Sequence, residues 1–238
     1  LSKNPVNAIY EDTSGVLWVG TVEGGLNRRA PGSHTFEHYT TDAPAHLSHN
    51  SVSCFTADDE GKLWIGTWGG GIGWIDMKNP QNKQFHHIEI PEYGDFSWGL
   101  AGSICYDRLN HAIWVGTSTN IYVYDLKIQT VMEPFKGMNL GGIEGCTGYY
   151  IDKDNHLWLG LTEGLCRIDL SSLKAPKLAY QLWKTKLDEP ESKLKERVTY
   201  ITQSKDGALW IGSNGYGFYK SSPTENGEYS FYSFTTEN

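Results

Sequence analysis

Few side chains in this chain have the types and positions that catalysis requires, and the strongest candidates are two glutamates. Glu23 and Glu163 stand at corresponding points in two copies of a repeated segment. Paired carboxylates that flank a sugar linkage are the catalytic groups of glycoside hydrolases, where one acts as acid and the other as base or nucleophile. No Ser-His-Asp order and no metal-ligand spacing accompanies them. We therefore predict no catalytic residue and keep a glycan hydrolase or lyase as the alternative.

Thiols and imidazoles are the other groups that could react or bind a metal. The cysteines all fall on predicted strands, outside any Cys-x-x-Cys pair: they are Cys54, Cys105, Cys146 and Cys166. A buried free cysteine behaves as a small hydrophobic residue, so we expect free thiols, with disulfides as the alternative. The close histidine pairs, His46 with His49 and His86 with His87, are weak metal candidates, since adjacent strand residues point to opposite faces. The sequence predicts no metal and no cofactor.

The elements that position these groups follow from a motif that occurs five times. It consists of an aliphatic residue, Trp, a second aliphatic residue, Gly, and then Thr, Ser or Leu. Its tryptophans are Trp18, Trp64, Trp114, Trp158 and Trp210. They recur every 44 to 52 residues. A regular period in this range indicates one supersecondary unit copied along the chain.

Each copy begins with two predicted strands and a tight turn. A large apolar residue stands nine residues before the Trp, or ten in the third copy: Ile9, Phe55, Ile104, Tyr149 and Ile201. Between them lies a turn rich in Asp, Gly or Asn, as at 12–15 and 58–61. Asp and Asn side chains bond their own backbone and Gly supplies positive φ, so these segments are predicted hairpin turns. The flanking β-branched and aromatic residues favour strands.

Two further runs follow a short turn that is rich in glycine in most copies. The third run is clearest at 121–125 and 165–169, and the fourth occurs at 35–39, 84–88, 178–183 and 229–234. Four antiparallel strands per repeat, without helical periodicity, predict the blade of a β-propeller. The predicted fold is all-β, a single β-propeller region over 1–238 with blades at 1–46, 47–97, 98–141, 142–193 and 194–238. The Trp then fills the layer between stacked blades, and the Gly two residues later relieves crowding.

Charge and hydropathy argue against two classes of partner. The formal net charge is −8, and the 20 basic residues are scattered along the chain. This composition disfavours nucleic acid and anionic membrane surfaces. No apolar run approaches the roughly 18 residues that span a bilayer. We expect no nucleic acid partner and no direct membrane contact by this region.

The phase of the repeats predicts a piece of a longer array. Leu-Ser-x-Asn-x-Val introduces the first copy at 1–6 and the second at 47–52, and 234–238 resembles the end of the first copy at 39–42. No run is out of phase to close a ring by joining the two chain ends. Uncovered blade faces would expose more apolar surface than a soluble monomer usually tolerates. We therefore expect these five blades to form part of a longer array.

One repeat family shares this pattern. Leu-Ser-x-Asn-x-Val, then Asp-x-x-Gly-x-Leu-Trp-[Ile/Val]-Gly-Thr-x-x-Gly-Gly-[Leu/Ile], then a Phe-x-x-Tyr strand, resembles the two-component regulator propeller repeat. The resemblance covers all five copies and is closest at 6–26 and 47–76, whereas the third and fourth copies have shorter turns. It implies the periplasmic sensor region of a Bacteroides-type hybrid two-component histidine kinase/response regulator. It further implies carbohydrate sensing upstream of a transmembrane kinase, and it implies that the five blades belong to a seven-bladed propeller.

Ligand recognition is predicted on the rim where the second-to-third-strand turns and the blade-to-blade connections emerge. Residues there that vary between repeats are the binding candidates: Glu23, Trp68, Tyr93, Phe96, Trp98, Glu163, Asn214 and Tyr216. Aromatic rings stack on the C–H faces of sugars, while carboxylates and amides bond the hydroxyl groups. Trp68, Trp98 and Tyr216 are the candidate aromatic platform. The alternative is that these rings only pack loops onto neighbouring blades.

Three classes of function remain, because a propeller fold alone does not specify one. The first is a sensor that binds an oligosaccharide and acts with the rest of a larger propeller array and a parent sensor kinase. The second is the propeller glycan hydrolase or lyase. The third is a structural module for interaction or homodimerisation. We expect the first.

Overall fold

The computed structural model describes most of the chain. The described residues are 1–3, 5–42, 45–79, 84–88, 103–117, 120–138, 146, 148–175, 177–184, 197–215, 217–223 and 229–234. The chain divides into two compact units. Unit 1 comprises Leu1–Ser118 and Tyr122–Met132, and unit 2 comprises Thr119–Ile121 and Glu133–Asn238. The predicted blade boundaries and the single propeller region over 1–238 remain predictions.

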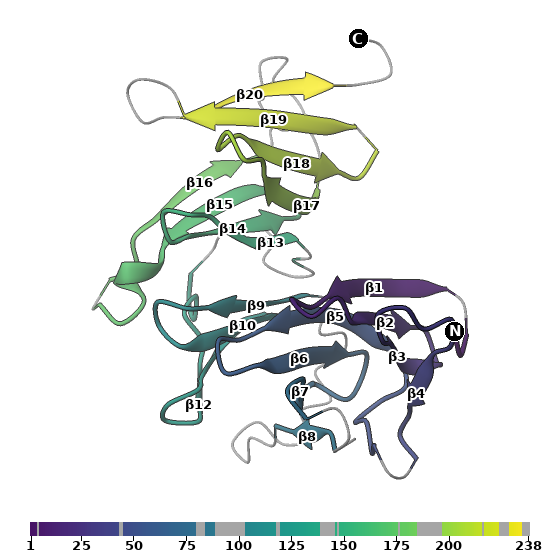
Figure 1. Cartoon of the computed structure of the whole chain (residues 1–238). Helices are drawn as coiled ribbons and strands as arrows, with labels where there is room; N and C mark the ends of the chain where they lie inside the picture. The colour runs from purple at the N-terminus through teal and green to yellow at the C-terminus, as the bar shows by residue number, and fades with distance from the viewer. Residues whose placement is uncertain are drawn as a thin grey trace. The chain divides into compact units, whose positions relative to one another are not determined.

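The first three four-stranded sheets, blades 1 to 3, come from the part of the chain that forms unit 1 (Figure 1). Blade 1 contains β1 (Val6–Glu11), β2 (Leu17–Thr21), β3 (Gly25–Arg29) and β4 (Glu37–Tyr39). Blade 2 contains β5 (Val52–Ala57), β6 (Lys62–Thr67), β7 (Ile72–Asp76) and β8 (His86–His87). Blade 3 contains β9 (Ser103–Asp107), β10 (Ala112–Gly116), β11 (Ile121–Asp125) and β12 (Thr130–Met132).

Unit 2 contains blades 4 and 5. Blade 4 contains β13 (Gly148–Ile151), β14 (His156–Leu161), β15 (Gly164–Asp169) and β16 (Tyr180–Lys184), with the 3-10 helix η2 (Leu170–Ser172) after β15. Blade 5 contains β17 (Val198–Gln203), β18 (Leu209–Ser213), β19 (Phe218–Pro223) and β20 (Tyr229–Phe234). In the described part of the chain, no helix has the length and apolar character needed to cross a membrane.

Every blade is an up-and-down antiparallel sheet. Its four strands follow one another across the sheet in chain order. The first strands of successive blades lie side by side: β1 beside β5 and β5 beside β9 in unit 1, and β13 beside β17 in unit 2 (Figure 1). Propeller blades have this arrangement, with the first strand innermost. The all-β class with five four-stranded antiparallel blades, predicted from the sequence, is confirmed.

The first hairpin of each blade has the predicted register. The apolar residue before the turn pairs with the residue after the Trp: Ile9 with Val19, Phe55 with Ile65, Ile104 with Val115, Tyr149 with Leu159, and Ile201 with Ile211. In the turns, Gly15 and Gly61 have φ of +80° and +88°, and Asn155 takes the corresponding place with φ of +60°. Gly adopts this left-handed conformation freely and Asn tolerates it, which explains the residue types.

Four of the five repeat tryptophans are buried between sheets or within them. Trp18, Trp64, Trp114 and Trp158 are at most 1% exposed. Trp18 and Leu26 of blade 1 form a core with Val52, Leu63 and Ile65 of blade 2. Equivalent cores join blades 2 and 3 around Trp64, and blades 4 and 5 around Trp158. The predicted burial of the tryptophans is confirmed for these four.

The Gly of each Trp-x-Gly unit has a specific neighbour in two of these cores. A Cβ added to Gly20 would lie 2.6 Å from Cγ1 of Val52, at the start of the next blade. A Cβ on Gly160 would lie 2.6 Å from Cγ1 of Val198. Interior packing leaves no room for such an overlap. The crowding that Gly relieves therefore comes from the first valine of the following blade.

Two sequence expectations are wrong in detail. Trp210 is only partly buried, because the described part of the chain contains no sheet after blade 5 to cover it. Cys146 precedes its predicted strand, since β13 begins at Gly148. The four cysteines lie outside any disulfide in the described part of the chain.

Candidate functional site

The turns between the second and third strands of blades 1, 2 and 5 share one hydrogen-bond pattern. The hydroxyl of the first residue donates to the carbonyl four residues on: Thr21 to Gly25 at 3.0 Å, Thr67 to Gly71 at 3.1 Å, and Ser213 to Gly217 at 3.0 Å. The ends of each turn are thereby fixed by the fold. The residues between them, including Glu23, Trp68 and Asn214, have exposed side chains. The fold thus leaves these positions free to differ between blades.

The same turns are bonded to the segments that enter each blade. Backbone N–H groups donate to carbonyls just before the first strand: Val22 to Pro5 at 3.1 Å, Trp68 to Ser51 at 2.8 Å, and Asn214 to Arg197 at 3.0 Å. Within each of blades 1, 2 and 5, the turn and the segment that enters the blade therefore lie at the same end of the sheet.

Ser51 joins the turns of blades 1 and 2. Its hydroxyl accepts a hydrogen bond from the backbone N–H of Glu23 at 3.1 Å, while its carbonyl accepts from Trp68. The carbonyl of Asn50 accepts from the N–H of Gly25 at 2.7 Å. Glu23 and Trp68 thus project from two turns that one residue connects. Among the described candidates, this is the pair that hydrogen bonds bring together.

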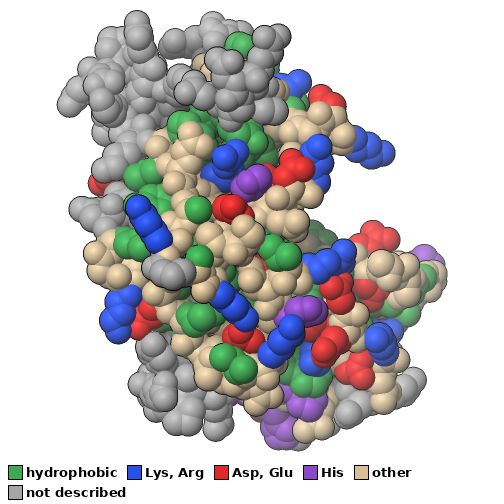
Figure 2. Space-filling view, turned by 90° about the vertical axis from the view of Figure 1, so that its left-hand side faces the viewer, with side chains coloured by type: hydrophobic (Ala, Val, Ile, Leu, Met, Phe, Trp, Pro, Cys, Tyr) green, Lys and Arg blue, Asp and Glu red, His purple; other side chains and the backbone are tan. Residues whose placement is uncertain are grey.

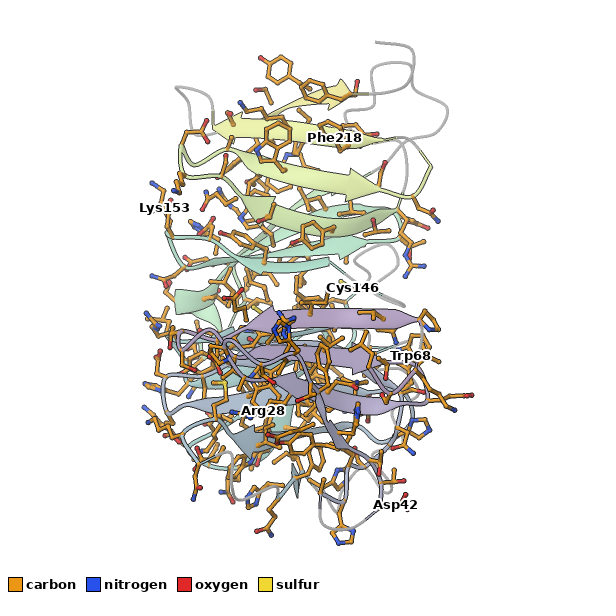
Figure 3. All side chains as sticks on the ribbon, turned by 45° about the vertical axis from the view of Figure 1, so that its right-hand side comes forward. Arg28, Asp42, Trp68, Cys146, Lys153 and Phe218 are labelled. Carbon is orange, nitrogen blue, oxygen red and sulfur yellow. The ribbon has the colours of Figure 1, made fainter. Side chains whose placement is uncertain are left out.

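Two further side chains border these turns, and we define Lys3, Glu23, His49 and Trp68 as the rim patch. Nζ of Lys3 lies 3.7 Å from the Glu23 carboxylate, with both side chains largely exposed. Nδ1 of His49 accepts from the N–H of Ser51 at 3.0 Å, so the neutral ring carries its proton on Nε2. The His49 ring also borders Gly69, next to Trp68 in the turn. Trp68 is 37% exposed and projects from the edge of its blade (Figure 3).

The backbone of Glu23 shows that the turn itself favours another residue. Its φ is +56°, whereas Gly69 and Gly215 occupy the corresponding place in blades 2 and 5 with φ of +100° and +101°. The left-handed region costs a residue with a Cβ roughly 1–2 kcal/mol. The carboxylate of Glu23 is therefore not a requirement of the fold.

The remaining candidates do not join this patch. Glu163 is exposed in the turn between β14 and β15, and Asn214 is exposed in the turn between β18 and β19; both belong to unit 2. Glu23 and Glu163 consequently lie in different units. Four candidates lie outside the described residues: Tyr93, Phe96, Trp98 and Tyr216.

Three of the four cysteines are poor nucleophiles at neutral pH. Burial raises the pKa of Cys54 to about 11, and that of Cys146 and Cys166 to about 12. The thiolate is the reactive form of cysteine. These three thiols therefore stay protonated in neutral solution. Within the described residues, no group of three or more His, Cys, Asp and Glu side chains could hold a metal ion.

Sequence reasoning missed Lys3, His49 and Ser51 as parts of the rim. They stand in the Leu-Ser-x-Asn-x-Val segments, whose serines contact the turn: Ser2 Oγ lies 3.4 Å from Thr21 Oγ1, and Ser48 Oγ lies 3.2 Å from Thr67 Oγ1. The joint recurrence of this serine with the Thr-x-x-Gly-Gly turn was the signal that could have identified them. On the face shown in Figure 2, acidic and basic side chains are interspersed.

Five up-and-down sheets of four strands, with their first strands side by side within each unit, define a protein of β-propeller blades. Residues 1–23 and 46–69 match the family model described as the two component regulator propeller. The two matched segments carry the turns of Glu23 and Trp68. The predicted resemblance is thus confirmed for these two segments, each of which matches the two-component regulator propeller repeat. No curated protein matches the chain.

Solved structures share the fold. An extracellular domain described as part of the hybrid two component system BT3049 of B. thetaiotaomicron has a TM-score of 0.74 and 22% identity, over 100% of this chain and 29% of that one. The extracellular domain of BT4673 from B. thetaiotaomicron has a TM-score of 0.73 and 22% identity, over 99% of this chain and 30% of that one. PorZ, a surface component of the type-IX secretion system of Porphyromonas gingivalis, has a TM-score of 0.67 and 19% identity, over 98% of this chain and 34% of that one. The chain therefore spans about a third of these proteins or less, and the likeness establishes its fold.

Proposed function

We propose that this chain is part of the ligand-sensing propeller of a hybrid two-component signalling protein. The two repeats that match the regulator propeller family support the signalling role. The description of similar structures as extracellular domains supports an extracytoplasmic position, for which we infer the periplasm. On this proposal, the partners are the rest of the propeller array and a parent sensor kinase.

The proposed ligand is a carbohydrate fragment that binds at the rim patch. The observation that carries this proposal is the link through Ser51, which holds the Glu23 turn and the Trp68 turn on one rim. An exposed indole offers a flat apolar surface to the C–H face of a sugar ring. The carboxylate of Glu23, the ammonium of Lys3 and Nε2–H of His49 offer an acceptor and donors for hydroxyl groups. The patch therefore combines the groups that sugar binding uses.

We propose binding rather than catalysis at this rim. A hydrolase of the usual type needs a second carboxyl about 5–10 Å from the first. In unit 1, the nearest charged partner that the structure gives Glu23 is Lys3, a cation. Burial raises the pKa of the Cys54, Cys146 and Cys166 thiols, which argues against each of these three as a nucleophile.

Titration calorimetry of the full chain against a panel of neutral and acidic oligosaccharides tests the proposal. For a sugar that binds, Trp68→Ala should weaken affinity about tenfold or more, equivalent to roughly 1.4 kcal/mol. Glu23→Gln keeps the size of the side chain and removes its charge, so it separates hydrogen bonding by the carboxylate from packing.

Tyr180→Ala is the matched control, because Tyr180 is an exposed aromatic residue on β16, in unit 2. It should bind as the wild type does. If a sugar binds with the same affinity to wild type, Trp68→Ala and Glu23→Gln, all of them folded, the site is not the rim patch. Release of reducing ends from the bound sugar would show catalysis and contradict the binding role.

A further inference from the structure

The backbone N–H of Ser51 depends on a histidine for its acceptor. Ser51 is buried, and its N–H donates to Nδ1 of His49 at 3.0 Å. Its other polar groups hold the two turns of the rim patch: Oγ accepts from the N–H of Glu23 at 3.1 Å, and the carbonyl accepts from the N–H of Trp68 at 2.8 Å. A buried N–H without an acceptor is destabilising. His49 therefore completes the set of bonds that fixes Ser51 between the two turns.

The bond between His49 and Ser51 has the spacing of an Asx turn, with a nitrogen acceptor in place of oxygen. In an Asx turn, the side-chain oxygen of Asp or Asn accepts from the N–H two residues on. Aspartates make this bond in three hairpin turns of the chain, each at 2.9 Å: Asp12 accepts from Ser14, Asp58 from Glu60, and Asp152 from Asp154. A carboxylate remains an acceptor down to about pH 4, whereas histidine changes charge between pH 5 and 8. The imidazole therefore makes this one turn sensitive to mild acid.

The blade fold does not require an acceptor at this position. In blade 1 the residue that corresponds to Ser51 is Pro5, whose carbonyl accepts from the N–H of Val22 as the carbonyl of Ser51 accepts from Trp68. Proline has no N–H to satisfy. Blade 1 thus keeps the bond between the entering segment and the turn without any residue in the role of His49. The histidine is a feature of blade 2, beside the exposed Trp68.

Protonation of His49 removes the acceptor of Ser51. The neutral ring carries its proton on Nε2 and offers the lone pair of Nδ1 to the N–H of Ser51. The imidazolium carries a proton on each nitrogen and accepts at neither. The side chain is partly buried, so it remains in contact with solvent. Its ring also borders Gly69, next to Trp68, and a charged ring would therefore act on this turn as well as on Ser51.

The segments around His49 contribute few titratable groups. The turn at 68–71, which borders the ring, consists of Trp and three Gly. The turn on the other side of Ser51 contributes the Glu23 carboxylate, which lies 3.7 Å from Nζ of Lys3. In the segment of His49 itself, Asp42 and His46 are exposed. Of these groups, the two histidines change charge between pH 5 and 8, and the N–H of Ser51 donates to His49.

We propose that His49 is a positioning residue of the rim patch, and that its protonation releases the N–H of Ser51 and weakens ligand binding in mild acid. Neutral His49 fixes Ser51, and Ser51 in turn holds the turns that carry Glu23 and Trp68. When the ring gains its second proton, this common anchor is loosened, and the carboxylate and the indole lose their fixed spacing. The effect on binding rests on the function proposed above, whereas the effect on the turns does not.

Proton–nitrogen NMR of the 238-residue chain without ligand tests the effect on the turns, over the range from about pH 8 to pH 5 in which histidine changes charge. The amide signals of Ser51 and Trp68 should shift with the same midpoint as the ring signals of His49. The protection factor of the Ser51 amide against hydrogen exchange should fall about tenfold, as the loss of one hydrogen bond predicts. His34→Gln is the control, because His34 is an exposed histidine between β3 and β4 and its loss should leave this profile unchanged.

Two substitutions of His49 separate positioning by the neutral ring from a general structural role. His49→Asn keeps a side-chain acceptor for the N–H of Ser51 and does not titrate in this range, so the Ser51 amide should stay protected at every pH. His49→Ala removes the acceptor, so protection should be about tenfold lower throughout. Unchanged protection of Ser51 in the wild type as His49 gains its proton overturns the proposal. A pH response in His49→Asn equal to that of the wild type does so as well.

Titration calorimetry tests the effect on binding separately. For a neutral sugar whose affinity is reduced by Trp68→Ala, the wild type should bind about tenfold more weakly at pH 5 than at pH 8, whereas His49→Asn should bind equally at both. A sugar that requires Trp68 but binds the wild type equally at both pH values would leave the proposed function intact and overturn the regulation proposed here. If no sugar binds, the proposed function fails, and the NMR profile still decides the role of His49.

Discussion

The indole Nε1 of Trp64 donates a hydrogen bond to Oδ2 of Asp58 at 2.9 Å, which joins the repeat tryptophan to the first residue of its own hairpin turn. The other oxygen of Asp58 accepts from the N–H groups of Glu60 and Lys62, both at 2.9 Å. The pair recurs in three other blades: Trp18 with Asp12 at 3.2 Å, Trp114 with Asp107 at 3.2 Å, and Trp158 with Asp152 at 2.8 Å. One carboxylate therefore holds the turn and satisfies the buried indole.

Removal of this carboxylate should destabilise unit 1. Asp58→Ala leaves the indole N–H of Trp64 buried without its acceptor, which should lower the free energy of unfolding by about 1–3 kcal/mol. Urea denaturation followed by tryptophan fluorescence measures the change. The control is Ser204→Ala in blade 5, where serine replaces the aspartate and bonds Asp206 and the carbonyl of Ala208. Equal losses in the two variants would contradict a special role for the Trp–Asp pair.

The glycine of the Trp-x-Gly unit should be required in blade 4, where a valine of the next blade packs against it, and dispensable in blade 5. Gly160→Ala forces a methyl group against Val198 and should cost about 1–3 kcal/mol through overpacking. Gly212→Ala meets its nearest neighbour at 3.4 Å and should change stability little. Thermal unfolding of both variants, at a concentration where the chain is monomeric, makes the comparison. A larger loss in Gly212→Ala than in Gly160→Ala would be inconsistent with the packing described for blades 4 and 5.

Glu23→Gly should stabilise the protein. Its φ of +56° lies in the left-handed region, where glycine avoids the Cβ penalty of roughly 1–2 kcal/mol. Part of this gain is offset by the greater freedom of glycine in the unfolded chain. Glu23→Ala keeps the Cβ and removes the carboxylate, so it should not stabilise. The unfolding midpoint in urea distinguishes these outcomes, and an equal rise for both variants would assign the effect to charge instead of backbone strain.

The blade fold was predictable because its main signals are local and repeated. The Trp period fixes the number of repeats, and the Asp-x-x-Gly turns place each first hairpin between residues such as Ile9 and Val19, which do pair. The Trp–Asp bond was not predicted, since the sequence assigns Asp to the turn and Trp to the core by separate reasoning. Its geometry appears only when the hairpin places the two side chains on one face.

The rim was predictable as a location, but its composition was less so. Glu23 and Trp68 stand out because they depart from the repeat pattern. The role of Ser51 depends on its hydrogen bond with Glu23 of the neighbouring blade, 28 residues away in the sequence. Trp210 stands in the same Leu-Trp-Ile-Gly run as Trp64, yet its exposure depends on what covers the face of its blade. Long-range packing of this kind leaves no signal within a single repeat.

The stability of the first hairpin should depend on pH through Asp12. Desolvation raises the pKa of this carboxyl, but hydrogen bonds from the Ser14 hydroxyl, the N–H of Val16, the Trp18 indole and the N–H of Ser14 outweigh it and hold the pKa below its ordinary value. Because the folded pKa lies below the unfolded value of about 3.9, Asp12 contributes stability above that pH and loses it as pH falls through the folded pKa. The unfolding free energy of wild type should therefore fall more steeply in acid than that of Asp12→Asn. Carboxyl carbon NMR checks the cause directly: a titration midpoint for Asp12 at or above the ordinary value would show that these bonds do not favour the charged form.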